Sequence, residues 1–179
     1  MQSITKVFWL FGRSGAGKTT LARGLCRRLK NAAIPVAYLD ADELRATLCS
    51  DLGFSPAARL ENHRRIAEVA RQLARQRLNV VVSTMAPEYA QRDRVAGVLR
   101  EMLVWFYIYA PLEICVARDP KGLYHRARSG EVKNLIDYPF DTPRAQECPN
   151  HVDTTTHNIE ACCDRIMDVA RAQLADFAI

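Results

Sequence analysis

The sequence predicts an α/β fold in which a parallel sheet carries helices on both faces. Five apolar runs of strand length alternate with stretches of helical periodicity, and a glycine-rich turn joins the first run to the first helical stretch. This alternation is typical of parallel sheets with crossover helices. The chain has 179 residues, 49% of them hydrophobic and 25% charged. That is enough to bury one core, so we expect residues 1–179 to form a single domain.

The expected strands are the apolar runs Ile4–Phe11, Val36–Leu39, Leu78–Ser83, Leu103–Tyr109 and His151–Thr155. The expected helices place apolar residues three or four positions apart: Lys18–Lys30, Ala57–Gln76, Glu88–Met102, Leu112–Arg118 and Asn158–Phe177. One stretch lacks this periodicity. Residues 119–150 are rich in proline and charge, and their number and composition predict a mobile lid and substrate loop.

The glycine-rich turn reads Gly12-Arg13-Ser14-Gly15-Ala16-Gly17-Lys18-Thr19, which is the spacing of a phosphate-binding loop. The glycines let several backbone N–H groups point at one anion, at the start of a helix. Lys18 would then reach the terminal phosphates, and the Thr19 hydroxyl would hold a magnesium ion. A chance glycine-rich turn is the alternative, which the correct strand and helix on either side disfavour.

Charge and composition narrow the class of partner. The net charge is +5, with the arginines spread along the chain, so no stripe for a nucleic acid polymer stands out. A modest positive balance suits a protein that binds several phosphates. No apolar run approaches the length of a membrane span, and the first residues lack the order of a signal peptide. We therefore expect a cytoplasmic protein that binds small molecules.

The six cysteines include no Cys-x-x-Cys pair and no metal-ligand spacing. Four of them fit apolar stripes and are expected to be small buried hydrophobes: Cys26, Cys115, Cys162 and Cys163. The surroundings of Cys49 and Cys148 are less regular and would allow exposure.

Two carboxylates follow the second expected strand, in the run Asp40-Ala41-Asp42. Ligands of open parallel sheets gather at the carboxyl ends of the strands. A carboxylate there could serve magnesium or take a proton from an attacking hydroxyl. Helix capping by either aspartate is the alternative. We favour Asp42 as the working group, because no aspartate follows the third strand in Ser83–Pro87.

Two further segments are candidates for ligand binding. Arg59, Asn62 and His63 share one face of a helix whose later turns are apolar, as expected where a helix enters a pocket. A solvated first turn explains the pattern almost as well, and we regard His63 as a bystander. The run from Arg118 to Arg128, with Lys133, concentrates cations that suit a lid over a phosphoryl group. An ordinary surface helix is the alternative.

Taken together, several segments resemble adenylylsulfate kinase, in order, over nearly the whole chain from residue 7. They are Gly12–Thr20, Leu39–Asp42, Asp51–Ser55, Arg59, Glu61-Asn62, Arg64-Arg65, Pro111–Glu113, Arg118–Tyr124, Ala127-Arg128 and Gly130–Lys133. The most specific is the run Asp119-Pro120-Lys121-Gly122-Leu123-Tyr124.

The resemblance implies a three-layer fold of the P-loop kinase type and a homodimer that serves sulfate assimilation. It also implies transfer of the γ-phosphoryl group of ATP, with Mg²⁺, to the 3′-hydroxyl of adenylylsulfate. The implied catalytic residues are Asp42, Lys18 and Lys121, and the implied metal ligands are Thr19 and Asp42. The implied ATP-binding residues are Gly12, Ser14, Gly15, Ala16, Gly17, Lys18, Thr19, Thr20 and Arg128. Those implied for the acceptor, the molecule that receives the phosphoryl group, are Asp40, Arg45, Phe54, Arg59, Asn62, Lys133 and Leu135.

The sequence departs from the family pattern mainly on the acceptor side. Leu135 stands where the family has an aromatic that stacks on the acceptor base opposite Phe54, and Met85–Glu88 replaces Ile-Ser-Pro-aromatic. Losing one stacking face costs about 1–3 kcal/mol, enough to redirect base selection. The alternative acceptor is therefore another 5′-nucleotide conjugate, as in cytidine diphosphoramidate kinases. A non-catalytic nucleotide-binding switch and a small-metabolite kinase are weaker alternatives.

Overall fold

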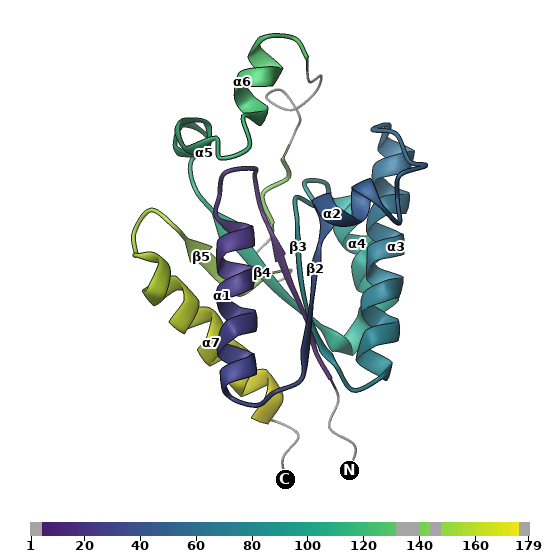
Figure 1. Ribbon diagram of the computed structural model, residues 1–179, viewed down its shortest axis with the longest axis vertical. Helices are drawn as coiled ribbons and strands as arrows, with labels where there is room; N and C mark the ends of the chain where they lie inside the picture. The colour runs from purple at the N-terminus through teal and green to yellow at the C-terminus, as the bar shows by residue number, and fades with distance from the viewer. Residues whose placement is uncertain (1–4, 132–139, 144–147, 176–179) are drawn as a thin grey trace.

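The computed structural model describes residues 5–131, 140–143 and 148–175 and forms three layers (Figure 1). Lys133 and Leu135 lie outside the described residues. The central sheet has five parallel strands in the order β2-β3-β1-β4-β5. The strands are β1 Val7–Phe11, β2 Val36–Asp40, β3 Asn79–Thr84, β4 Leu103–Tyr109 and β5 His151–Asp153. The predicted parallel sheet with helices on both faces is confirmed.

Two helices cover each face of the sheet. Helices α1 (Lys18–Asn31) and α7 (Ile159–Ala175) pack together on one face, and α3 (Pro56–Arg75) and α4 (Tyr89–Leu99) pack together on the other (Figure 1). Each strand supplies side chains to the cores on both faces of the sheet, because successive side chains of a strand point to opposite faces. In β1, for example, Phe8 and Leu10 belong to the core under α1, whereas Trp9 belongs to the core under α3.

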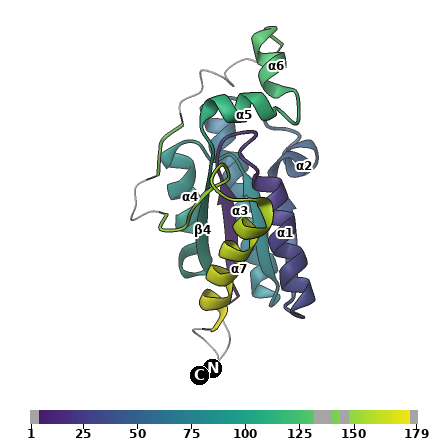
Figure 2. The same cartoon turned by 90° about the vertical axis from the view of Figure 1, so that its left-hand side faces the viewer.

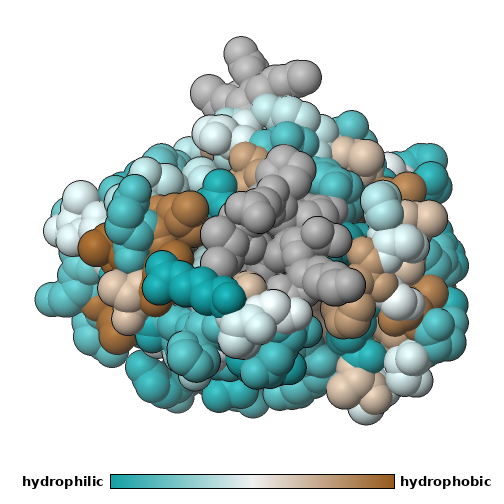
Figure 3. Space-filling view, turned by 90° about the horizontal axis from the view of Figure 1, so that it is seen from above, coloured by the Kyte–Doolittle hydropathy of each residue, from teal (hydrophilic) through white to brown (hydrophobic). Residues whose placement is uncertain are grey.

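The carboxyl ends of the strands meet at one edge of the sheet. Phe11 of β1 is in register with Thr84 of β3, and Asp40 of β2 is in register with Ser83 of β3. Three short helices lie beyond this edge, away from the two chain termini (Figures 1 and 2). They are α2 (Ala41–Ala46), α5 (Leu112–Arg118) and α6 (Leu123–Arg128). Seen from above, this end of the molecule is mostly hydrophilic, with scattered apolar patches (Figure 3).

The expected elements are present with small shifts at their ends, and β4 and α5 have the expected bounds. Helices α2 and α6 are not among the expected helices, but they correspond to the alternatives given for these two runs, a helix capped by an aspartate and a surface helix. The expected helix Glu88–Met102 is divided, since α4 ends at Leu99 and a short 3₁₀ helix, η1, runs over Arg100–Met102. Arg100 has a φ of 49°, a left-handed value that interrupts the α-helix.

Cys49 and Cys148, which we expected could be exposed, are both buried. Cys49 lies in the loop after α2, and Cys148 belongs to the core under α3 and α4. Among the helices of the described residues, none has the length and apolar character needed to cross a bilayer.

Candidate active site

The phosphate-binding loop joins β1 to α1, where its glycines adopt conformations that side chains resist. Gly15 and Gly17 have φ values of 78° and 100°, which favour glycine. A Cβ at Gly15 would lie 2.5 Å from the carbonyl oxygen of Cys115, so the loop can pass α5 only without a side chain. Gly17 precedes α1 and supplies no side-chain cap, which leaves the first N–H groups of α1 available for an anion.

Lys18 lies in the first turn of α1 and turns back over the loop. Its ammonium group donates to the carbonyl oxygen of Arg13 at 2.7 Å. Burial lowers the pKa of Lys18 to about 8, while the nearby carboxylate of Asp42 works in the opposite direction. Lys18 is therefore mostly protonated near pH 7 and stands beside an acid.

The two aspartates after β2 have different surroundings. Asp40 is buried and caps α2, since its carboxylate accepts from the backbone N–H of Asp42 at 3.0 Å. It also accepts from the hydroxyl of Tyr38 at 2.8 Å, and that hydroxyl lies 2.7 Å from Ser83. Asp42 is exposed, and its carboxylate pairs with the ammonium group of Lys121. The helix-capping alternative is therefore confirmed for Asp40, whereas the carboxylate of Asp42 does not cap a helix and faces the cavity.

The segment after α5 is tied to the phosphate-binding loop. Arg118 donates to the hydroxyl and carbonyl of Thr154 at 2.8 and 3.0 Å and to the carbonyl of Gly15 at 3.4 Å. The Tyr124 hydroxyl donates to the carbonyl of Ser14 at 3.0 Å. These contacts hold Lys121 over the loop.

A cavity of about 1250 Å³ runs along the carboxyl edge of the sheet and joins these groups. Many expected site residues line it: Ser14, Gly15, Gly17, Lys18, Thr19, Thr20, Asp40, Asp42, Arg45, Phe54, Arg59, Asn62 and Lys121. Gly12 and Ala16 are buried in the loop behind it. Arg128, an expected ATP ligand, is exposed on α6 and is not among the lining residues, whereas Arg126 is.

One end of the cavity, here called the acceptor end, is lined by Arg45, Phe54, Arg59, Asn62, His63 and Thr84. The Phe54 ring is 69% exposed, and the guanidinium groups of Arg45 and Arg59 lie 5.0 and 5.7 Å from its centroid. The same arginines donate to the carbonyls of Gly53 and Phe54. A large ring exposed in a cavity is suited to stack on a base, and the two cations beside it are suited to bind an anionic substituent.

The loop that carries Phe54 is braced by ion pairs. Arg65 of α3 binds the carboxylate of Asp51 at 2.6 Å and that of Glu61 at 3.0 Å. Hydrogen bonds from Arg64 and Arg65 lower the pKa of Glu61 to about 2, so it stays ionised. Ser55 caps α3 by accepting from the N–H of Ala58 at 3.2 Å.

Some residues of the cavity wall were not expected from the sequence. His63, regarded as a bystander, is 5% exposed and lines the cavity. Its Nδ1 lies 2.8 Å from the carbonyl of Arg59, and its Nε2 lies 3.1 Å from the hydroxyl of Thr84. At the other end, Thr154 and Ile159 also line the cavity. His63 shares the helix face of Arg59 and Asn62, a local pattern that could have included it, whereas Thr154 and Ile159 belong to no local motif and are placed only by the fold.

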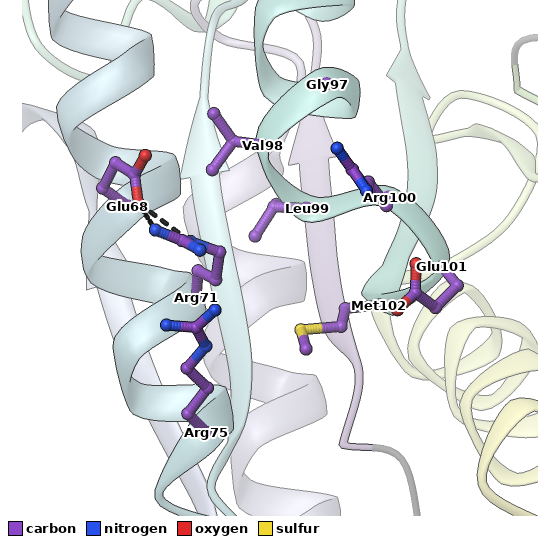
Figure 4. A pocket seen from close by; sticks show the side chains of 9 residues that line it. All are labelled: Glu68, Arg71, Arg75, Gly97, Val98, Leu99, Arg100, Glu101 and Met102. Carbon is purple, nitrogen blue, oxygen red and sulfur yellow. Dashed lines mark hydrogen bonds and ion pairs between the residues drawn. The ribbon is translucent and has the colours of Figure 1, made fainter.

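A second cavity, of about 430 Å³, lies between α3 and the end of α4 (Figure 4). Arg71, Arg75 and Arg100 line it, and Arg71 is paired with Glu68 at 2.5 Å. It contains none of the expected site residues. The cavity at the carboxyl edge is therefore the candidate active site.

The described residues contain no group of three or more His, Cys, Asp or Glu side chains that could hold a metal ion. Oxygen donors are nevertheless present beside the loop, as the Thr19 hydroxyl and the Asp42 carboxylate, which both line the cavity. Magnesium commonly takes only one or two protein oxygens and completes its shell with water and phosphate. The residues present therefore fit a magnesium ion held with a nucleotide.

The site defines the class of protein as a P-loop kinase, because a glycine loop lies at a helix N-terminus with a lysine over it and an acid beside it. The family model for adenylylsulphate kinase matches residues 4–150. The chain therefore belongs to the adenylylsulphate kinase family.

Individual relatives agree with this placement. The chain is 44% identical over 143 residues to an adenylyl-sulfate kinase of Paraburkholderia xenovorans, covering 79% of this chain and 80% of that one. It is 41% identical over 167 residues to an adenylyl-sulfate kinase of Synechococcus, covering 92% and 93%. An APS kinase of Mycobacterium tuberculosis, solved with AMPPNP and APS, superposes with a TM-score of 0.88 at 32% identity, covering 95% and 99%. A Sinorhizobium meliloti gluconokinase, at 17% identity and a TM-score of 0.64, shares the fold.

Proposed function

We propose that this protein transfers the γ-phosphoryl group of ATP to the 3′-hydroxyl of adenylylsulfate, forming 3′-phosphoadenylylsulfate and ADP. The observation that carries the proposal is the position of Lys18, Asp42 and Lys121. They line one cavity, at the point where the phosphate-binding loop meets the acceptor end. A phosphoryl group leaving the loop would meet a hydroxyl of the acceptor beside an acid and two ammonium groups.

The ATP molecule fits the half of the cavity on the β5 side of the loop. The triphosphate lies against the N–H groups of Gly15, Gly17 and Lys18, at the N-terminus of α1. The base then lies toward Arg118 and Ile159, whose side chains line this half. Ile159 is 57% exposed, which leaves its side chain open to contact with a flat base.

Adenylylsulfate fits the acceptor end. Its base stacks on Phe54, and its phosphosulfate lies toward the guanidinium groups of Arg45 and Arg59. Asn62 is 3% exposed, and its Oδ1 has no hydrogen-bond partner among the described residues, so it can accept a donor from the acceptor. We include Asp40, Lys133 and Leu135 in this end on the family resemblance.

The chemistry requires one proton transfer and one exchange of P–O bonds. The 3′-oxygen of the acceptor attacks the γ-phosphorus, the bond to the β-phosphate oxygen breaks, and the hydroxyl proton passes to Asp42. Lys18 and Lys121 stabilise the negative charge on the transferring group. Magnesium, held by Thr19 and Asp42, would neutralise charge on the β- and γ-phosphates. Arg118 and Tyr124, which tie the covering segment to the loop, limit the access of water.

A second acceptor class is supported by one observation. Among the described residues that line the cavity, Phe54 is the only phenylalanine, tyrosine or tryptophan. One-sided stacking would tolerate a pyrimidine, as in a cytidine conjugate. Incubation with MgATP and a panel of 5′-nucleotide conjugates, with ADP release as readout, separates these cases. Adenylylsulfate-dependent ADP supports the proposal, and no acceptor-dependent ADP from any conjugate overturns it.

Two further expectations are carried as proposals. We propose that the protein acts in the cytoplasm, which its six free and buried thiols support, because such thiols suit a reducing compartment. We also propose that it forms a homodimer, on the family resemblance alone. Sedimentation of the purified chain tests this by its mass.

A further inference from the structure

The wall of the acceptor end contains a buried histidine whose proton can be located from its neighbours. Nδ1 of His63 lies 2.8 Å from the carbonyl oxygen of Arg59, and a carbonyl can only accept. Nδ1 therefore carries the proton and donates. Burial lowers the pKa of His63 to about 4, so the ring is neutral near pH 7 and its Nε2 is an acceptor.

This tautomer fixes the role of Thr84. The Thr84 hydroxyl lies 3.1 Å from Nε2 of His63, and since Nε2 is an acceptor, the hydroxyl hydrogen is donated to it. Thr84 also lines the cavity. With its hydrogen committed to His63, the hydroxyl can offer a ligand only its lone pairs. The wall thus presents an acceptor at Thr84 that cannot rotate into a donor.

Two amide oxygens add to this acceptor character. Gln91 is fully buried at the start of α4 and lines the same cavity. Its amide nitrogen donates to the carboxylate of Glu88 at 2.9 Å, which orients the oxygen away from Glu88. That oxygen, like Oδ1 of Asn62, has no hydrogen-bond partner among the described residues. Buried oxygens of this kind call for a donor.

We propose that Thr84 is a specificity-determining residue whose hydroxyl oxygen accepts a hydrogen bond from the exocyclic amino group of the acceptor base, and that His63 is the positioning residue that holds the hydroxyl in this role. The amino bases adenine and cytosine offer such a donor. Hypoxanthine and uracil present a carbonyl oxygen at the same place, which faces lone pairs and is rejected. This inference rests on the proposed function.

The test compares two acceptors that differ only at the C6/N1 edge of the base. Adenylylsulfate has an amino group at C6 and a bare N1, and its inosine counterpart has a carbonyl at C6 and a hydrogen on N1. The ratio of their kcat/KM values with MgATP is measured for the wild-type protein and three variants. In the wild type we expect a preference for adenylylsulfate of about tenfold or more. Thr84→Val removes the hydroxyl at constant shape and should bring the ratio near one, whereas Thr84→Ser keeps the hydroxyl and the preference.

The variant His63→Phe separates positioning from packing. Without Nε2, the Thr84 hydroxyl can rotate and donate to a carbonyl, so use of the inosine conjugate should rise while the KM for ATP stays unchanged. A Thr84→Val ratio equal to that of the wild type overturns the inference, as does a wild-type ratio near one. Failure of the wild type with both of these acceptors and with the cytidine and uridine conjugates overturns the proposed function and the inference together. Should a cytidine conjugate be the acceptor, cytidine and uridine form the matched pair.

Discussion

Lys121 and Asp42 form an ion pair although 79 positions separate them in the sequence. Asp42 lies in the first turn of α2, beyond the end of β2. Lys121 lies between α5 and α6, on the segment that Arg118 and Tyr124 fasten to the phosphate-binding loop. Both residues line the cavity together with Lys18, and the charges of both act on its ammonium group. A transferring phosphoryl group would separate the two charges and place Lys121 against its oxygens, which leaves Asp42 to accept a proton.

Replacement of this acid gives the first prediction. Asp42→Asn should lower kcat by about 10²- to 10⁴-fold, because the amide cannot accept the hydroxyl proton. The Kd for AMPPNP, measured by calorimetry, should change little, since the loop itself is intact. Glu43→Gln is the matched control, because Glu43 is the adjacent exposed acid on α2 and does not line the cavity. Unchanged turnover in Asp42→Asn would remove Asp42 from the chemistry.

Lys18 gives a prediction about pH. Burial holds its pKa at about 8 in the free protein, and a bound triphosphate favours the protonated form and so raises that pKa. The affinity for AMPPNP is therefore highest below about pH 8. It falls as the pH rises above this value, by at most about tenfold per pH unit. Calorimetry at several pH values checks this. Lys18→Arg stays charged throughout and should show no such fall. An AMPPNP affinity of the wild type that stays constant with pH would contradict the contact between Lys18 and the triphosphate.

The phosphate-binding loop gives a prediction about stability. Gly15→Ala should destabilise the protein by about 1–3 kcal/mol, because its φ is 78° and a Cβ would press on the carbonyl of Cys115. ATP affinity should fall with it. Gly97→Ala is the control, since Gly97 lies in α4 with open space around it and should gain up to about 1 kcal/mol. Urea unfolding measures both. Equal changes in the free energy of unfolding in the two variants would show that the loop tolerates a side chain.

Phe54 gives a prediction about the acceptor. The ring is largely exposed, so Phe54→Ala should leave the Tm nearly unchanged. The KM for adenylylsulfate should rise roughly 5- to 150-fold through the lost stacking. Leu48→Ala, an exposed hydrophobic residue that does not line the cavity, should change neither quantity. A parallel rise in the KM for ATP would mean that Phe54 acts on the whole site.

The sequence predicted most of the fold, because its signals are local. The phosphate-binding loop is one continuous run, and the buried strands and long amphipathic helices carry their periodicity in a few turns. Helices α2 and α6 were missed because each has six residues, too few to show a period. Their positions are set by contacts, such as the cap from Asp40 and the backbone bonds that Asp119 accepts at the start of α6.

The candidate site was predictable where a motif carried it and not elsewhere. The aspartate pair after β2 pointed to Asp42, because strand ends gather at one edge of a parallel sheet. The pairing of His63 with Thr84 joins residues from different elements, so no local pattern reveals it. The same holds for Arg118 and Thr154. Lys133 and Leu135 remain predictions, since they lie outside the described residues.

The most direct test of the central claim follows the transferred group itself. The protein is incubated with adenylylsulfate, Mg²⁺ and ATP labelled with radioactive phosphorus at the γ position, and the labelled nucleotide is treated with a 3′-nucleotidase. We expect the label to pass to the acceptor and to be released as inorganic phosphate by that treatment. Label that stays in ATP, or that reaches water without reaching any nucleotide acceptor, would contradict the account.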